Sequence, residues 1–395
     1  MAPDPSGTSA APAPEAAAVR SVLLAGGGSA GHVSPLLALA DCLRRRDPAV
    51  QITALGTATG LEAQLVPARG YPLSTIEKVA FPRRPGPAAW AFPRSLARAV
   101  QGAADALERA DAQVVVGFGG YVSTPAYLAA RRRGVPIVIH EGNARPGLAN
   151  RLGARLTRYV ATTFPMTRLP HARVIGMPLR REVTTLDRAR LRPEALQAFG
   201  LRDDAPTVLV TGGSLGAQRL NEAFAGAAGD LRAAGIQVLH LTGAGKGFDP
   251  FSPPGSPDSP GSAYPPYPPY PPYVVREYAD RMDLAYAAAD LVVCRAGANT
   301  VCEVSALGLP ALYSPLPIGN GEQRFNVADV VAARGAEVVD NDQLTADWVR
   351  QVVIPLIGDP RRLSSMASAA AATGQRDADE RLADLVALAV AEAGR

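Results

Sequence analysis

The chain repeats one local pattern in its two halves, and this repeat constrains the fold more than any other feature. "VLLAGGGSAG" at 22–31 returns as "TVLVTGGSLGAQ" at 207–218, and "VVVGFGGYVSTPAYLAA" at 114–130 is matched by "LVVCRAGANTVCEVSALG" at 291–308. Each copy reads as an apolar strand, a glycine turn and a helix, which is typical of parallel sheets covered on both faces. We therefore predict an α/β protein with two Rossmann-like, doubly wound parallel-sheet domains facing a cleft, where the carboxyl ends of the strands bind ligand.

The length of 395 residues is sufficient for two such domains. The Pro- and Ala-rich start lacks a basic leader before an apolar run, so we expect a disordered tail rather than a signal peptide. The proline-tyrosine segment reads as a surface loop, with partner docking as the alternative. The predicted organisation is a tail at 1–20, a first domain at 21–178, a second domain at 179–375, a loop insert at 249–273 and a C-terminal helix at about 376–395 that packs back on the first domain.

Composition limits the compartment and the partners. The net charge is +4, and lysine occurs only at 78 and 246, so the positive charge is almost entirely arginine. This favours phosphate-bearing partners, although a GC-rich coding bias explains it equally well. The three cysteines show no paired or metal-ligand spacing, and no apolar run is long enough to span a bilayer. We expect an intracellular protein without a nucleic-acid partner.

The first glycine turn fits two motifs at once, G-x-G-x-x-G from Gly26 and G-x-S-x-G from Gly27. A dinucleotide site also needs an acidic residue at the end of the second strand, but 50–60 contains none and Asp47 precedes that strand. A nucleophile elbow needs a late histidine, and His240 comes too early. Both alternatives are disfavoured, and a dehydrogenase remains open only if an acidic ribose ligand was missed.

Several polar residues stand where ligands of such sheets bind. Glycine turns at helix N-termini attract anions, and duplicated turns favour a diphosphate. His32 follows the first turn and is a candidate general base, with a buried structural histidine as the alternative. "IHEGNARPGLANR" at 139–151 places Asn143 at a strand end without a zinc-ligand pattern. Glu303 is a candidate ribose ligand, with a helix-surface charge as the alternative.

The segment 78–101 mixes aromatic and basic side chains. This composition suits the headgroup layer of an anionic membrane, to which one such segment binds weakly and reversibly. An ordinary amphipathic helix packed on the core is the alternative. The candidate residues for acceptor or membrane contact are Phe81, Arg83, Arg84, Trp90 and Phe92.

The whole set of motifs resembles the MurG family of bacterial glycosyltransferases, which have the GT-B fold. The matching motifs, in chain order, are "GGGSAGHVSP", "GFGGYVSTP", "HEGNARPGLANR", "GMPLR", "GGSLGAQRLN", "REYADRMDLAYAAADLVVCRAGANTVCEVSALGLPA" and "PLPIGNGEQRFN". The resemblance implies inverting transfer of N-acetylglucosamine from UDP-N-acetylglucosamine to the C4 hydroxyl of lipid I, the undecaprenyl-pyrophosphoryl-N-acetylmuramoyl-pentapeptide, which forms lipid II for peptidoglycan. It also implies a peripheral enzyme on the cytoplasmic side of the membrane, with an anionic membrane surface and other cell-wall synthesis proteins as partners.

The resemblance assigns site residues as well. His32 lies on the acceptor side. The residues expected to bind UDP-N-acetylglucosamine are Ser29, Ala30, Gly31, Asn143, Arg180, Ser214, Ala279, Ala298, Asn299, Thr300, Glu303 and Gln323. No cofactor is required, because helix dipoles and backbone amides replace a metal at the diphosphate, although a divalent cation can still stimulate.

Five positions depart from the family pattern: Ala30, Gly142, Met177, Leu215 and Glu322. Met177 and Leu215 remove polar groups beside the expected donor site. Two functional alternatives remain. The first is another GT-B glycosyltransferase with a lipid or natural-product acceptor, and the second is a nucleotide-sugar-binding protein without turnover, which would not need His32.

Overall fold

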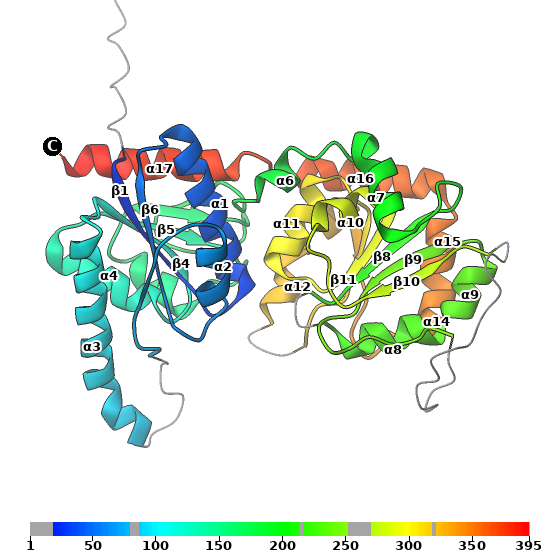
Figure 1. The fold of residues 1–395 in the computed structure, drawn as a ribbon, viewed down its shortest axis with the longest axis horizontal. Coiled ribbons are helices and arrows are strands. Elements are labelled where there is room, and N and C mark those ends of the chain that lie inside the picture. The colour runs from blue at the N-terminus through cyan, green and yellow to red at the C-terminus, as the bar shows by residue number, and fades with distance from the viewer. Residues whose placement is uncertain (1–18, 80–86, 214–215, 252–269, 318–320, 395) are drawn as a thin grey trace, which may run out of the picture.

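The computed structural model describes residues 19–79, 87–213, 216–251, 270–317 and 321–394. It contains two parallel sheets, one in each half of the chain (Figure 1). The first has seven strands in the order β3-β2-β1-β4-β5-β6-β7, and the second has six in the order β10-β9-β8-β11-β12-β13. The repeated motifs occupy equivalent places, because β1 and β4 are neighbours in the first sheet as β8 and β11 are in the second. The predicted pair of doubly wound sheets is confirmed.

The first sheet is covered by helices on both faces. Along β1, Val22 and Leu24 belong to the core that includes α1 and α17, while Leu23 and Ala25 belong to the core that includes α3 and α4. This alternation follows from side chains pointing to opposite faces of a strand. The elements are β1 (Ser21–Gly26), α1 (Ala30–Arg46), β2 (Gln51–Gly56), α2 (Glu62–Ala68), β3 (Leu73–Thr75), α3 (Pro87–Arg109), β4 (Val114–Gly119), α4 (Ser123–Arg133), β5 (Ile137–Glu141), α5 (Leu148–Gly153), β6 (Tyr159–Thr162) and β7 (Ala172–Val174).

The second sheet is covered in the same way. Val208 and Val210 of β8 pack with α8, and Leu209 packs with the core that contains α10 and α11. The elements are α6 (Arg181–Thr184), α7 (Arg188–Phe199), β8 (Thr207–Thr211), α8 (Gln218–Gly226), α9 (Ala228–Ala233), β9 (Gln237–Leu241), β10 (Tyr273–Arg276), α10 (Met282–Ala288), β11 (Leu291–Cys294), α11 (Ala298–Ala306), β12 (Ala311–Tyr313), α12 (Glu322–Asn326), α13 (Ala328–Ala332), β13 (Ala336–Val338), α14 (Ala346–Trp348), a π-helix (Val349–Val353), α15 (Ile354–Ile357), α16 (Pro360–Thr373) and α17 (Ala378–Ala393).

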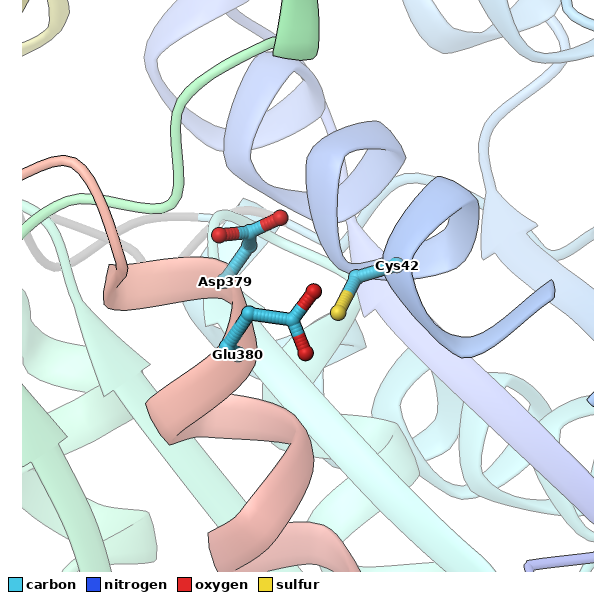
Figure 2. A group of neighbouring side chains, drawn as sticks. All are labelled: Cys42, Asp379 and Glu380. Carbon is cyan, nitrogen blue, oxygen red and sulfur yellow. The ribbon is translucent and has the colours of Figure 1, made fainter. Parts of the chain in front are cut away.

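The last helix returns to the first half of the chain. α17 packs against α1 and against strands β4, β5 and β6, and Figure 1 shows it in red along the first sheet. Figure 2 shows Cys42 of α1 beside Asp379 and Glu380 of α17. The thiol sulfur and one carboxylate oxygen of each acidic residue lie within 4.8 Å of one another, a spacing that could suit a metal ion. The guanidinium groups of Arg45 and Arg46 already bind these two carboxylates at 2.6–3.0 Å. Burial, reinforced by the two carboxylates, raises the pKa of the Cys42 thiol to about 12, so the cluster is a salt-bridged contact around a neutral thiol.

The predicted loop insert at 249–273 ends too late. Its final residue, Tyr273, is the first residue of β10 and pairs with Val238 of β9. The Tyr273 hydroxyl lies 2.8 Å from Nδ1 of His240, and the ring packs edge-on to Phe248. Tyrosine followed by two valines is a good strand sequence, and this outweighs the preceding proline pattern. The tail at 1–18 and the segment 252–269 lie outside the described residues.

Within the described part of the chain, no helix combines the length and apolarity needed to cross a bilayer.

Candidate functional site

The N-termini of α1 and α11 meet across the two halves of the chain. Each helix follows a glycine turn at the carboxyl end of a central strand, β1 or β11. Asn299, in the first turn of α11, donates through Nδ2 to the carbonyl oxygen of Ala30 at 3.1 Å. Helix N-termini carry free N–H groups and partial positive charge, so two of them together favour a diphosphate. The contact unites two groups of the predicted donor-binding residues, Ser29, Ala30 and Gly31 with Ala298, Asn299 and Thr300.

A second contact between the halves involves Asn326, the last residue of α12. Its Oδ1 accepts from the backbone N–H of Ala144 at 2.9 Å, and its Nδ2 donates to the carbonyl of Ala296 at 3.2 Å. Nδ2 also lies 3.4 Å from Oδ1 of Asn143. Asn326 therefore links the loop after β5 to the turn before α11. The sequence interpretation missed it, since only its position in "GEQRFN" beside Gln323 could have indicated it.

Gln323 lies on the same short helix. Its Oε1 accepts from the backbone N–H of Leu316 at 2.9 Å, which leaves the amide nitrogen as the free end of the side chain for donation. Asn143 is held by its backbone, which donates to Oε1 of Glu141 at 2.9 Å. Asn143 and Gln323, both predicted to bind UDP-N-acetylglucosamine, are therefore held by these bonds, one in the loop after β5 and the other on α12.

Glu303 is buried inside the site rather than exposed on a helix surface. Its residue exposure is 7%. Oε1 accepts from Arg180 at 3.1 Å, and Oε2 accepts from the hydroxyl of Tyr286 at 2.8 Å. Burial disfavours the charged form of Arg180, but the carboxylate outweighs this and raises the Arg180 pKa. Each carboxylate oxygen keeps a further lone pair, so the pair can still accept two ribose hydroxyls.

His32 is held with a defined proton position. Nδ1 lies 3.0 Å from the carbonyl oxygen of Gly27 and 3.2 Å from Oγ of Ser29. A carbonyl can only accept, so Nδ1 carries the proton and Nε2 keeps its lone pair in the neutral ring. Burial lowers the pKa of His32, and this outweighs the opposing effects of the Gly27 bond and the Glu62 charge. The ring is therefore neutral and basic at Nε2 near pH 7.

Gly119, at the end of β4, leaves space beside the basic nitrogen. A Cβ placed at this residue would lie 3.1 Å from Nε2 of His32, and its φ of 95° is one that favours glycine. A side chain at Gly119 would therefore crowd Nε2 of His32. In the sequence, "GFGG" was identified as a strand-turn pattern and as part of a family motif, without a role beside His32.

An acidic residue near the first glycine turn was missed. Glu62, the first residue of α2, is fully buried and accepts from the backbone N–H of Gly28 and of Thr57. Its carboxylate faces the backbone of the turn and has no exposed surface for a ribose. Glu62 is therefore not the acidic ribose ligand that the dehydrogenase alternative requires.

The remaining predicted residues lie elsewhere or outside the described residues. Ala279 is buried in the loop between β10 and α10. Trp90 is 87% exposed near the start of α3, and Phe92 packs against the core of the first sheet. The predicted residues outside the described part are Phe81, Arg83, Arg84 and Ser214.

Two departures from the family pattern fit each other. Met177 is 1% exposed, and its Cε lies 3.3 Å from the position of a Cβ at Gly142. The methionine methyl thus fills the space that the glycine leaves, so two of the positions that depart from the family pattern form one apolar contact. Leu215 lies outside the described residues.

Family models match both halves of the chain. The glycosyltransferase family 28 N-terminal domain matches residues 22–162, and the glycosyltransferase family 28 C-terminal domain matches residues 207–382.

Curated relatives match over nearly their whole length. A protein of Streptomyces coelicolor is 53% identical over 95% of this chain and 99% of its own, and one of Nocardioides sp. is 55% identical over 92% and 97%. Both are named UDP-N-acetylglucosamine--N-acetylmuramyl-(pentapeptide) pyrophosphoryl-undecaprenol N-acetylglucosamine transferase.

Solved structures agree. Acinetobacter baumannii MurG is 29% identical with a TM-score of 0.74, covering 93% of this chain and 99% of that one. The calicheamicin glycosyltransferase CalG4, 19% identical with a TM-score of 0.60 over 93% of this chain and 98% of that one, shares the fold. The chain therefore belongs to the MurG family of N-acetylglucosaminyltransferases and has the GT-B fold.

Proposed function

We infer that the chain transfers N-acetylglucosamine from UDP-N-acetylglucosamine to the C4 hydroxyl of lipid I and so forms lipid II. The relatives named for this reaction support the inference. The observation that carries it is the meeting of the α1 and α11 N-termini, with His32 in the first turn of α1 and Glu303 further along α11. One helix thus offers a base and the other a nucleotide-binding carboxylate.

The arrangement suits an inverting displacement. Nε2 of His32 takes the proton of the acceptor hydroxyl while its oxygen attacks the anomeric carbon of the donor sugar. The bond from that carbon to the diphosphate oxygen breaks, and UDP leaves with the bonding electrons. The N–H groups of the two helix N-termini and the guanidinium of Arg180 stabilise the charge that develops on the diphosphate. Glu303 holds the ribose, and Asn143 and Gln323 contact the sugar.

We propose that this chemistry needs no bound metal, because helix N-termini and arginine supply the positive field. A divalent cation acts at most as a stimulant. The metal question is tested in the same assay as the reaction, by adding EDTA.

The test of the reaction is UDP release by the purified protein, measured with and without a short-chain lipid I analogue, with mass analysis of the lipid. We expect UDP release that depends on the analogue, addition of one N-acetylhexosamine, and no loss with EDTA. An analogue without the C4 hydroxyl is the matched control and should give no product. Tight UDP binding with no transfer to the intact analogue would contradict the lipid II function and favour another acceptor or a binding role.

We further propose that the protein acts as a peripheral enzyme on the cytoplasmic face of the membrane, in contact with an anionic bilayer through the start of α3. Trp90 is 87% exposed, and Arg94, one turn later, is also exposed. An exposed tryptophan with neighbouring arginines suits the headgroup layer. Contacts with other cell-wall synthesis proteins stay a prediction of the family resemblance.

Replacing Trp90 with alanine should weaken binding to phosphatidylglycerol vesicles about tenfold, because the variant no longer buries the apolar surface of the indole ring in the membrane interface. Transfer to a water-soluble lipid I analogue should stay unchanged. Co-sedimentation with vesicles measures the first effect and UDP release the second. Leu388→Ala, a partly exposed position on α17, is the control. Equal vesicle binding by the Trp90 variant and the native protein would contradict this membrane contact.

A further inference from the structure

Glu62 is a fully buried carboxylate that the mechanism above does not use. Oε2 accepts from the backbone N–H of Gly28 at 2.8 Å, and Oε1 accepts from the N–H and the hydroxyl of Thr57 at 2.8 and 2.7 Å. A Cβ at Gly27, Gly56 or Gly60 would lie within 2.4 Å of a Glu62 atom. Three glycines therefore make room for this one carboxylate against the first glycine turn.

A single peptide unit connects Glu62 to His32. The peptide bond between Gly27 and Gly28 is trans, so its N–H and its carbonyl point in opposite directions. The N–H of Gly28 points at Oε2 of Glu62, and the carbonyl of Gly27 points at Nδ1 of His32, 3.0 Å away. Gly28 has a φ of 86°, which a residue with a side chain rarely adopts. The glycine turn thus fixes the carboxylate, the peptide and the imidazole in one line of hydrogen bonds.

We propose that Glu62 is a positioning residue for His32 and acts through the Gly27–Gly28 peptide. The proposal rests on the role of His32 as the base in the proposed function. A carboxylate that accepts from the peptide N–H polarises the peptide and makes its carbonyl a stronger acceptor. The carbonyl then holds the proton on Nδ1 and turns Nε2 toward the acceptor hydroxyl. It also stabilises the imidazolium that forms, as a directly bonded carboxylate does in a serine-hydrolase triad.

Among the described residues, Glu62 is the group whose charge acts on His32, from the far side of the Gly27–Gly28 peptide. From β4 the neighbour is Gly119, where a Cβ would lie 3.1 Å from Nε2 of His32 and 3.5 Å from Nδ2 of Asn150 on α5, and from the same turn it is Ser29. From the second half of the chain the neighbour is Asn299, which donates to the carbonyl oxygen of Ala30 and carries no charge. Glu141 lies one side chain further away, bonded to Asn150 at 3.0 Å.

The sign of the electrostatic effect follows from these contacts. Burial disfavours the charged form of Glu62, but its hydrogen bonds outweigh this and lower its pKa, so it is ionised at neutral pH. Its negative charge raises the pKa of His32. Glu62→Gln keeps the shape and removes the charge, so the pKa of His32 should fall. The acidic limb of the pH–rate profile, where the base must lose its proton, should move to lower pH.

The kinetic experiment compares Glu62→Gln with the native protein. We expect kcat to fall roughly tenfold to a hundredfold, as for other residues that orient a functional histidine. The KM for UDP-N-acetylglucosamine should change less than about twofold, since the donor-side contacts of Glu303 are intact. Glu108→Gln is the matched control, because Glu108 is 70% exposed in its ion pair with Arg133. A residue that only packs the turn would leave the acidic limb in place, and that result would overturn the proposal.

A direct measurement separates this proposal from the proposed function. Nitrogen-15 NMR of protein labelled in histidine, with the His32 signals assigned by loss in His32→Ala, reports the protonated ring nitrogen and the imidazole pKa without turnover. We expect Nδ1 to be protonated in the native protein and the pKa to fall in Glu62→Gln. An unchanged His32 pKa in a protein that makes lipid II would overturn the positioning role alone. Failure of transfer with these signals as expected would overturn only the function.

The native protein also provides a test that does not depend on folding of the variant. The chain of hydrogen bonds requires the neutral ring of His32 to carry its proton on Nδ1. Protonation of Nε2 in the native neutral ring would overturn the proposal even if Glu62→Gln does not fold.

Discussion

Replacing His32 with alanine should lower the rate of N-acetylglucosamine transfer about 10²–10⁴-fold, the usual contribution of a general base. Nε2 is the unprotonated nitrogen of a ring whose Nδ1 is committed to the Gly27 carbonyl, and Gly119 leaves space beside it. Binding of UDP should change little, because the proposed donor contacts of Glu303, Arg180 and the two helix N-termini do not use the His32 side chain. Transfer to the lipid I analogue and calorimetric binding of UDP measure the two effects.

The control for His32 is an exposed histidine in the same half of the chain. His171 has a φ of 59°, so His171→Asn is the suitable change, because asparagine tolerates this backbone conformation better than alanine. It should match the native protein in both measurements. Parallel losses of transfer and UDP binding in His32→Ala, with a lowered melting temperature, would mean that the histidine supports the turn rather than the chemistry.

Much of the fold could be predicted because its signals are local. The apolar runs at β1, β4, β8 and β11 each end in glycines followed by a helical pattern, and paired strands of this kind imply parallel sheets. The end of the proline-tyrosine segment was predicted wrongly at Tyr273, since the strand there depends on pairing with β9. Strand pairing is a contact between distant residues, and proline content does not report it.

The site residues also differ in whether local sequence or a contact between distant residues places them. The position of His32 in the first turn of α1 follows from the local sequence. Glu62 accepts a hydrogen bond from Gly28, 34 positions away, and Asn326 accepts one from Ala144, 182 positions away. Contacts between such distant residues cannot be predicted from the local pattern of a single sequence. The sequence also left Glu303 open as a surface charge. Its burial against Tyr286 and Arg180 becomes visible only when α10, α11 and the chain before α6 come together.

Replacing Glu303 with glutamine should raise the KM for UDP-N-acetylglucosamine about tenfold to a hundredfold, because a hydrogen bond to a charged group contributes about 1.5–3 kcal/mol. The carboxylate is fixed by Arg180 at 3.1 Å and by Tyr286 at 2.8 Å, so it presents its remaining lone pairs to the ribose without reorganisation.

The donor analogue with a 2′-deoxyribose tests this role. The native protein should bind the analogue more weakly than the natural donor, whereas Glu303→Gln should show a smaller preference, because its neutral amide is a weaker acceptor for the 2′-hydroxyl than the carboxylate. Glu337→Gln, which breaks the more exposed ion pair with Arg362 in the same half of the chain, should keep the native preference. An undiminished preference for the natural donor in Glu303→Gln would assign the ribose to another residue and leave Glu303 as the partner that holds Arg180 at the diphosphate.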